Sequence, residues 1–288
     1  MNNEKKLDIV VQGGLWPFTN TTLYYYKSLP FVNEVILSTW KDEKYLDTID
    51  WPGPVILSDK PEKNGIGNMN LQILSTQAGL AESTADYVMK TRTDWKIYDH
   101  YIEREFLEFH SRLNNLPEIK FAYKEGTVKP IFSGAIAHNL PYHPNDVIML
   151  ARTKDLIEFW DVPFTDEECD HSNQWGDHHQ QADKGLDFNK TVRNPVWFGL
   201  HYAAKFSKVA KKHLDSHKEY VVDNAPKYAE ALEESKKIRN ILWQPMRKPD
   251  IWWVKTPDNK YPHHWTADYD YYYNDEYIYR ELKTVKVK

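Results

Sequence analysis

The stretch Ala85-Asp86-Tyr87-Val88-Met89-Lys90-Thr91-Arg92-Thr93-Asp94-Trp95 decides the fold of this chain. Tyr87 to Met89 suit a buried strand, whereas Lys90, Arg92 and Asp94 alternate and so share one of its faces. Two cations and a carboxylate therefore meet at the carboxyl end of a predicted strand, which is the edge of an open α/β sheet where ligands bind. Because Lys and Arg suit phosphate and Asp suits a divalent ion or a ribose hydroxyl, this pattern favours a nucleotide diphosphate ligand.

Strands and helices alternate through the first half of the chain, outward from this stretch. The predicted strands are Leu7–Gln12, Val35–Thr39, Pro54–Leu57 and Tyr87–Arg92, and the predicted helices between them are Thr19–Ser28 and Asn68–Glu82. An alternation of this kind implies parallel strands joined by right-handed crossovers. We therefore predict an α/β fold, a three-layer sandwich around a mostly parallel central sheet.

The second half of the chain has a looser pattern. It predicts helices over Asp99–Leu113, Lys154–Trp160, Trp197–Leu214 and Pro226–Ile241, and a strand over Val147–Ala151. We expect one domain over residues 1–288. We divide it into residues 1–98, residues 99–242 and residues 243–288, the last an aromatic-rich, largely helical or irregular wrap.

Composition limits the classes of function that remain. A net charge of −5 argues against a nucleic-acid-binding protein. The lone Cys169 excludes an internal disulfide and is compatible with a reducing compartment. The sequence has no run resembling a signal peptide, and none approaches the roughly 20 apolar residues of a membrane helix. We therefore expect a soluble, cytoplasmic protein, located in the host cytoplasm if its source is viral.

Polar residues at other predicted strand and helix ends extend the candidate nucleotide site. Gln12 and Gly13 end the first strand, where a nucleobase would lie, and Asp59 closes the third strand as either a ribose ligand or a turn-capping residue. The helix that begins near Asn68 could direct its amino-terminal amides at a diphosphate, although Asn68 itself could simply cap it. Two further amides follow on this helix, Asn70 and Gln72.

Four ordered motifs in the first hundred residues carry a family resemblance. They are Val10–Gly13, Val35–Trp40, Asn68–Thr76 followed by Gly79-Leu80, and Tyr87–Asp94. With these motifs the chain resembles the WavE lipopolysaccharide-synthesis family of glycosyltransferases. The resemblance implies a GT-A-like fold, a nucleotide-sugar donor with UDP favoured, and a glycan acceptor in surface polysaccharide or glycoprotein glycan synthesis. It also implies that residues 1–98 are the nucleotide-sugar-binding half and residues 99–242 the acceptor-side half. It also adds Thr39, in the second motif, to the donor-binding residues.

The resemblance sets Asp94 in the place of the last Asp of the GT-A Asp-x-Asp motif, whose first Asp is Arg92 here. Two ways of neutralising the charge of the leaving diphosphate follow. Either Asp94 anchors Mn²⁺ or Mg²⁺ with help from a distant His, or Arg92 and Lys90 neutralise the diphosphate themselves. A third interpretation is an Arg92–Asp94 ion pair at the surface.

An inverting transfer also needs a carboxylate that takes the proton of the acceptor hydroxyl. Asp146 is the first candidate, because it lies beside a predicted strand beyond the donor half and loosely matches an acidic position of the family. Glu167 and Glu168, next to Asp166, are the second. Two alternative functions stay open, a sugar-nucleotide pyrophosphorylase and a non-catalytic carbohydrate-binding module. The second would use the 11 Trp and 19 Tyr to stack on sugar rings.

Overall fold

The computed structural model describes residues 6–65, 68–134, 141–165, 194–215, 225–246 and 251–253. The first half contains β1 (Leu7–Gln12), α1 (Thr19–Lys27), β2 (Val32–Trp40), a short 3₁₀ helix (Leu46–Thr48), β3 (Val55–Ser58), α2 (Met69–Ala81), β4 (Tyr87–Arg92) and β5 (Trp95–Ile97). The second half contains α3 (Asp99–Leu113), β6 (Ile119–Lys120), β7 (Thr127–Val128), β8 (Ile131–Ser133), β9 (Met149–Arg152), α4 (Thr153–Trp160), α6 (Asn194–Ala204), α7 (Lys208–Asp215), α8 (Ala225–Leu242), β10 (Trp243–Pro245) and β11 (Ile251–Trp253).

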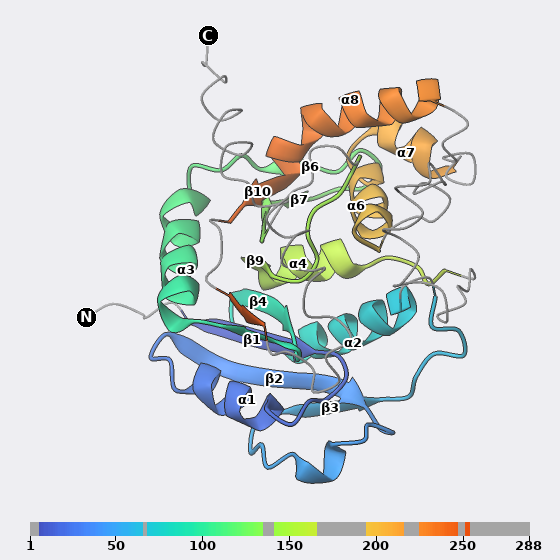
Figure 1. The fold of residues 1–288 in the computed structure, drawn as a ribbon. Helices are drawn as coiled ribbons and strands as arrows, with labels where there is room; N and C mark the ends of the chain where they lie inside the picture. The colour runs from blue at the N-terminus through green and yellow to red at the C-terminus, as the bar shows by residue number, and fades with distance from the viewer. Residues whose placement is uncertain are drawn as a thin grey trace.

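A seven-stranded sheet with the order β10-β8-β9-β4-β1-β2-β3 forms the centre of the fold (Figure 1). β3, β2, β1 and β4 pair in parallel, and so do β8 and β10. β9 pairs antiparallel with both of its neighbours, so it is the one reversed strand of these seven. The predicted α/β class with a mostly parallel central sheet is confirmed.

Alternating side chains of the central strands separate the core into two layers. Val10, Ile36 and Val88 point to the face that packs against α2, α4 and α6. Their neighbours Ile9 and Leu37 point to the other face, which α1 and α3 cover. Figure 1 shows the remaining helices, α6 to α8, grouped beyond α4 at the end of the molecule opposite α1. The predicted three-layer arrangement is therefore present.

Several short elements differ from the sequence prediction. β5, β6, β7, β8 and β10 were not predicted, because two or three residues are too few to show a periodic pattern. The single helix predicted over Trp197–Leu214 is two helices, α6 and α7. The helical conformation is interrupted between them. The hydroxyl of Ser207 accepts the backbone N–H of Ala210 at 3.2 Å and so caps the first turn of α7.

The region expected to form an aromatic wrap contributes two described strands. β10 extends the central sheet beside β8, and β11 pairs antiparallel with β5. The rest of that region, residues 247–250 and 254–288, lies outside the described residues, and the division into 1–98, 99–242 and 243–288 stays a prediction.

A buried carboxylate, Asp8, fixes the amino edge of the sheet. One of its oxygens accepts the Asn33 side-chain amide and the Glu34 backbone N–H at 2.9 and 3.1 Å. The other accepts the Ser83 hydroxyl and the backbone N–H groups of Thr84 and Ala85, all at 2.8 to 2.9 Å. This carboxylate therefore ties β1 to the start of β2 and to the turn that enters β4.

Replacing Asp8 by alanine leaves three part-buried backbone N–H groups without their acceptor, so we expect Asp8→Ala to lower the free energy of unfolding by about 3 kcal/mol. Urea denaturation measures this change. Asp47→Ala, at an exposed position of the 3₁₀ helix, is the control and should change stability by less than about 0.5 kcal/mol. A loss below about 1 kcal/mol for Asp8→Ala would contradict this role.

Candidate active site

The candidate site lies on the α2 and α4 face of the sheet, at the edge where the parallel strands end. In the strand register Lys90 is the partner of Val10, and Arg92 is the partner of Gln12, which in turn faces Ser38. Because alternate residues of a strand share a face, Gln12, Lys90 and Arg92 point to the same side as Val10. The predicted convergence of charged groups beyond β4 is thus present in the fold.

Lys90 is a fully buried ammonium group. Its side chain has 0% exposure, and its Nζ atom donates a hydrogen bond to the backbone carbonyl of Asp146. The same atom lies 4.8 Å from the centre of the Trp160 ring, an aromatic face that favours a cation. Burial lowers the pKa of Lys90 to about 7, because its removal from water outweighs the attraction of Asp146. The amine is therefore close to half charged at neutral pH.

Asp146 completes a cluster with two of the predicted donor residues. Its side chain is 7% exposed, and its carboxylate accepts a hydrogen bond from the Nε2 atom of Gln72 on α2. Its backbone carbonyl is held by Lys90 on β4. The sequence predicted that Lys90 and Gln72 bind the nucleotide-sugar donor. In the structure both hold Asp146, the residue predicted to be the catalytic base.

Arg92 and Asp94 form a two-pronged ion pair. The Nε atom of Arg92 lies 2.9 Å from Oδ1 of Asp94, and its Nη2 atom lies 2.6 Å from Oδ2. The two side chains are 35% and 18% exposed, so the pair lies at the rim of the site. The ion-pair interpretation considered for the sequence therefore describes their geometry.

Asp94 was also predicted to hold Mn²⁺ or Mg²⁺. Both of its oxygens accept N–H groups of Arg92, so an ion bound there would lie directly beside a guanidinium charge. Divalent cations of this type need several oxygen ligands, and the described segments contain no cluster of three or more His, Cys, Asp or Glu that could hold a metal. Within the described residues the Asp94 carboxylate is therefore engaged by Arg92, and its role as a metal ligand stays a prediction.

The ends of β1 and β4 are joined next to this ion pair. Gln12 is buried, and its side-chain oxygen accepts the hydroxyl of Ser75 on α2 at 2.7 Å. Gly13 has a positive φ of 120° and approaches Thr93, whose backbone N–H donates to the Gln12 carbonyl at 3.0 Å. The Thr93 hydroxyl also donates to the Gly14 carbonyl. Gln12 and Gly13 thus lie at the end of β1 beside Arg92, and their contact with a nucleobase stays a prediction.

Two predicted donor residues lie apart from this cluster. Thr39 is fully buried and alternates with Ser38, so it points to the α1 and α3 face with Leu37 rather than to the face of Gln12. Asp59 follows β3, is exposed, and pairs with Lys41 at 2.7 Å. The structure therefore brings neither side chain to Lys90 or Asp146.

The two asparagines at the start of α2 differ in their contacts. Asn68 is the N-cap residue with a left-handed φ of 62°, but its side chain makes no capping hydrogen bond. Asn70 is buried, and its amide donates to the carbonyls of Lys63 and Thr165 while accepting the Thr165 backbone N–H at 2.8 Å. Asn70 therefore fastens two loops together. Glu167 and Glu168, the second candidates for the base, lie outside the described residues.

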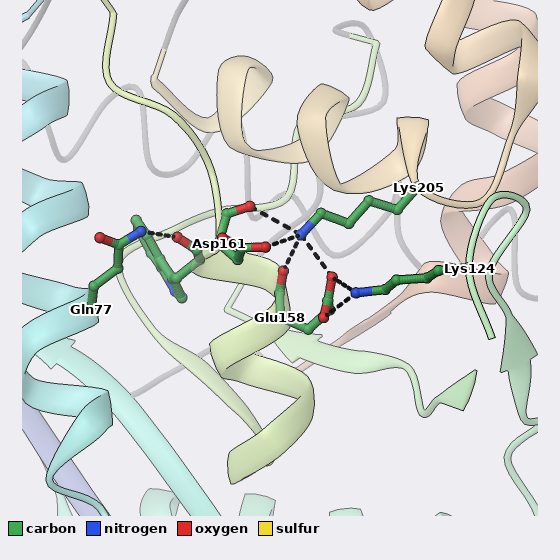
Figure 2. A network of polar contacts seen from close by, with 6 residues as sticks. Gln77, Lys124, Glu158, Asp161 and Lys205 are labelled. Carbon is green, nitrogen blue, oxygen red and sulfur yellow. Dashed lines mark hydrogen bonds and ion pairs between the residues drawn. The ribbon is translucent and has the colours of Figure 1, made fainter. Parts of the chain in front are cut away.

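A polar network steadies the end of α4, next to the ring that supports Lys90 (Figure 2). The Nζ atom of Lys205 contacts the carbonyls of Glu158 and Asp161 at 2.7 and 3.0 Å, where a helix end favours a cation. The side-chain amide of Gln77 donates to the Trp160 carbonyl at 2.8 Å. Trp160, Ser75 and Thr93 were not among the predicted site residues, since their roles depend on packing between elements distant in sequence.

The depressed pKa of Lys90 makes the stability of the fold depend on pH. Below pH 7 the folded chain bears the full cost of a buried charge, and this cost decreases as the pH rises from 7 toward 10.5, the ordinary value of lysine. Lys90→Met removes the cost, so its stability relative to the wild type should fall by about 2 kcal/mol between pH 7 and pH 9. Urea titrations at both values measure this difference. Lys120→Met, at an exposed position, should show no such change, and an equal difference at both pH values would contradict the burial of a titrating amine.

The fold is therefore an α/β sandwich whose otherwise parallel central sheet contains one reversed strand and carries a charged cluster at its carboxyl edge. The chain belongs to the WavE lipopolysaccharide synthesis family, whose family model matches residues 23–220. The family expected from the sequence motifs is therefore confirmed.

Solved structures show distant similarity to this chain. The mannosyltransferase PcManGT from Pyrobaculum calidifontis, in complex with GDP-Man and Mn²⁺, has 11% identity and a TM-score of 0.38, covering 82% of this chain and 87% of its own. TarS 1-349 from S. aureus has 12% identity and a TM-score of 0.35, covering 69% of this chain and 56% of its own. A 4-diphosphocytidyl-2C-methyl-D-erythritol synthase has 9% identity and a TM-score of 0.35, covering 54% and 79%.

A search of curated proteins gave no match. Among the helices that the structure describes, none combines the length and the apolar character needed to cross a membrane.

Proposed function

We propose that this protein is a glycosyltransferase that moves a sugar from a nucleotide diphosphate donor, with a UDP-sugar favoured, to a glycan acceptor in surface polysaccharide or glycoprotein glycan synthesis. The observation that carries the proposal is the contact between Lys90 and Asp146. It places a candidate base beside the charged end of β4 in a chain of a lipopolysaccharide synthesis family. This arrangement supplies a carboxylate for the acceptor and a cation for the leaving group on one face of the sheet.

On the donor side, Arg92 is the residue that meets the diphosphate. Glycosyl transfer builds negative charge on the departing diphosphate, and a guanidinium binds phosphate oxygens through paired N–H groups. The carboxylate of Asp94 holds this guanidinium at the rim of the site through two hydrogen bonds. Lys90 lies too deep for the donor, and its role is to hold Asp146.

On the acceptor side, Asp146 takes the proton of the attacking hydroxyl as the new glycosidic bond forms and the bond to the diphosphate breaks. Gln72 donates to one oxygen of this carboxylate and so limits its rotation. The nearly complete burial of Asp146 excludes water from the base. We also propose that the donor nucleotide is UDP, that the acceptor is a glycan and that the protein is cytoplasmic.

A thermal-shift screen against UDP, GDP, CDP, CMP and their sugars tests the donor class, because a ligand that binds only the folded chain raises its melting temperature. We expect UDP and a UDP-sugar to give the largest shifts, with equal size in EDTA and in Mn²⁺. A shift that requires Mn²⁺ would restore Asp94 as a metal anchor with further ligands. Shifts by nucleoside triphosphates and sugar phosphates would favour a pyrophosphorylase, and binding of glycans without nucleotides would favour a carbohydrate-binding module.

Arg92→Gln should weaken binding of the nucleotide found in that screen by about 10- to 100-fold, because it removes a charge-assisted contact and leaves the Asp94 carboxylate facing the diphosphate. Isothermal titration calorimetry measures the change in Kd. Lys27→Gln, which removes an exposed cation at the other edge of the sheet, is the matched control and should leave Kd within twofold. Equal affinities of Arg92→Gln and the wild type would exclude Arg92 as the diphosphate ligand.

Asp146→Asn keeps the size of the side chain and removes its ability to accept a proton. We expect kcat for release of the nucleoside diphosphate to fall by about 10²- to 10⁴-fold while the Kd of the donor stays within threefold. Full activity in a normally folded Asp146→Asn protein would assign the base elsewhere, with Glu167 and Glu168 as the next candidates.

A further inference from the structure

Tyr142 has an unusual backbone conformation four residues before Asp146. Its φ is 52°, in the left-handed region that a bulky residue rarely adopts, and its side chain is buried. A residue keeps such a conformation only where its surroundings determine it, and positions of this kind gather at functional sites. The contacts that determine it are therefore informative.

Two helices of the second half hold the backbone of Tyr142. Its N–H donates to the hydroxyl of Ser235 on α8 at 2.8 Å, in a buried position. On α6, Gly199 lies so close that a Cβ atom added to it would stand 1.9 Å from the Tyr142 carbonyl oxygen and 2.7 Å from Cδ of Pro144. The first of these atoms belongs to the backbone, so any side chain at position 199 must displace the segment.

The other end of the same segment is fixed at the candidate site. The hydroxyl of Ser133 donates to the Asn145 carbonyl at 2.8 Å, and Lys90 and Gln72 hold the backbone and the carboxylate of Asp146. Residues 142–146 thus form a short, buried span between α6 and α8 at one end and β4 and α2 at the other. Closely packed interiors transmit displacements, so a shift at Tyr142 reaches Asp146.

We propose that Gly199 and Ser235 are positioning residues for Asp146, which they hold at the site by locking the backbone of residues 142–146. This inference rests on the proposed function for the role of Asp146. The locking of the backbone of residues 142–146 is independent of that role. In the proposed reaction it gives α6 and α8 the task of positioning Asp146, beyond their contribution to the core.

The locking is tested by the reactivity of Lys90, since segment 142–146 covers its amine. In a pulse of acetic anhydride followed by peptide mass spectrometry, Lys90 of the wild type should react at least 100-fold more slowly than the exposed Lys120. Gly199→Ala and Ser235→Ala should each raise Lys90 acetylation at least tenfold at an unchanged rate for Lys120. Ser235→Thr, which keeps the hydroxyl, should stay within twofold of the wild type.

Ala203→Gly is the matched control for Gly199→Ala, because it weakens the same helix one turn further along without adding an atom against Tyr142. The three variants are compared under conditions that give them equal overall stability. The proposal would be overturned if the Lys90 acetylation rates of Gly199→Ala and Ser235→Ala were no higher than that of Ala203→Gly. Should Gly199→Ala fail to fold, the pair Ser235→Ala and Ser235→Thr decides the question in the same way.

A kinetic measurement separates this proposal from the proposed function. With the donor found in the nucleotide screen, Ser235→Ala should lower kcat at least tenfold and leave the KM of the donor within twofold, since it displaces the base and not the diphosphate ligand. If the wild-type protein turns over none of the nucleotide sugars, the proposed function fails, while Lys90 acetylation still shows whether Gly199 and Ser235 hold the segment.

Discussion

The candidate site depends on the burial of one ammonium group, that of Lys90. Removing a charge from water is costly, and the fold offsets this cost with the hydrogen bond that Lys90 donates to the Asp146 carbonyl and with the face of the Trp160 ring. Any rearrangement that separates these groups leaves a buried charge without a partner. The need to satisfy Lys90 therefore holds the segment before β9 against the end of β4, and with it the carboxylate of Asp146.

The two edges of the sheet use charge in different ways. At the amino edge, the Asp8 carboxylate is surrounded by five donors and serves as a fixed joint. At the carboxyl edge, the charges of Arg92 and Asp94 are partly exposed and paired with each other. Such a pair can exchange its partner for a phosphate group at little cost, because a pair open to solvent contributes little to stability. In the proposed function, the amino edge is therefore fixed, and the ion pair at the carboxyl edge can respond to a ligand.

Local patterns predicted the long elements well and the contacts between them poorly. The bounds of β4 and α3 agree with the sequence prediction, because a run of buried residues and a helical spacing of aromatics define them. Lys90 and Asp146 were both selected by residue type and position. Their contact depends on the antiparallel pairing of β4 with β9, and no short window of sequence encodes the pairing of strands so far apart. For the same reason the sequence assigned Lys90 to a ligand, whereas the fold buries it.

The reversed direction of β9 has a consequence for how this site can vary among related chains. In a purely parallel sheet, a strand's preceding loop emerges at the edge away from the ligand. Because β9 runs the other way, the chain that enters it arrives at the same edge where β1 and β4 end. In the proposed function, the donor side is thus encoded by segments that leave the sheet and the acceptor side by a segment that enters it. Changes in residues 142–148 would then alter acceptor preference and leave the strands proposed to hold the donor unchanged.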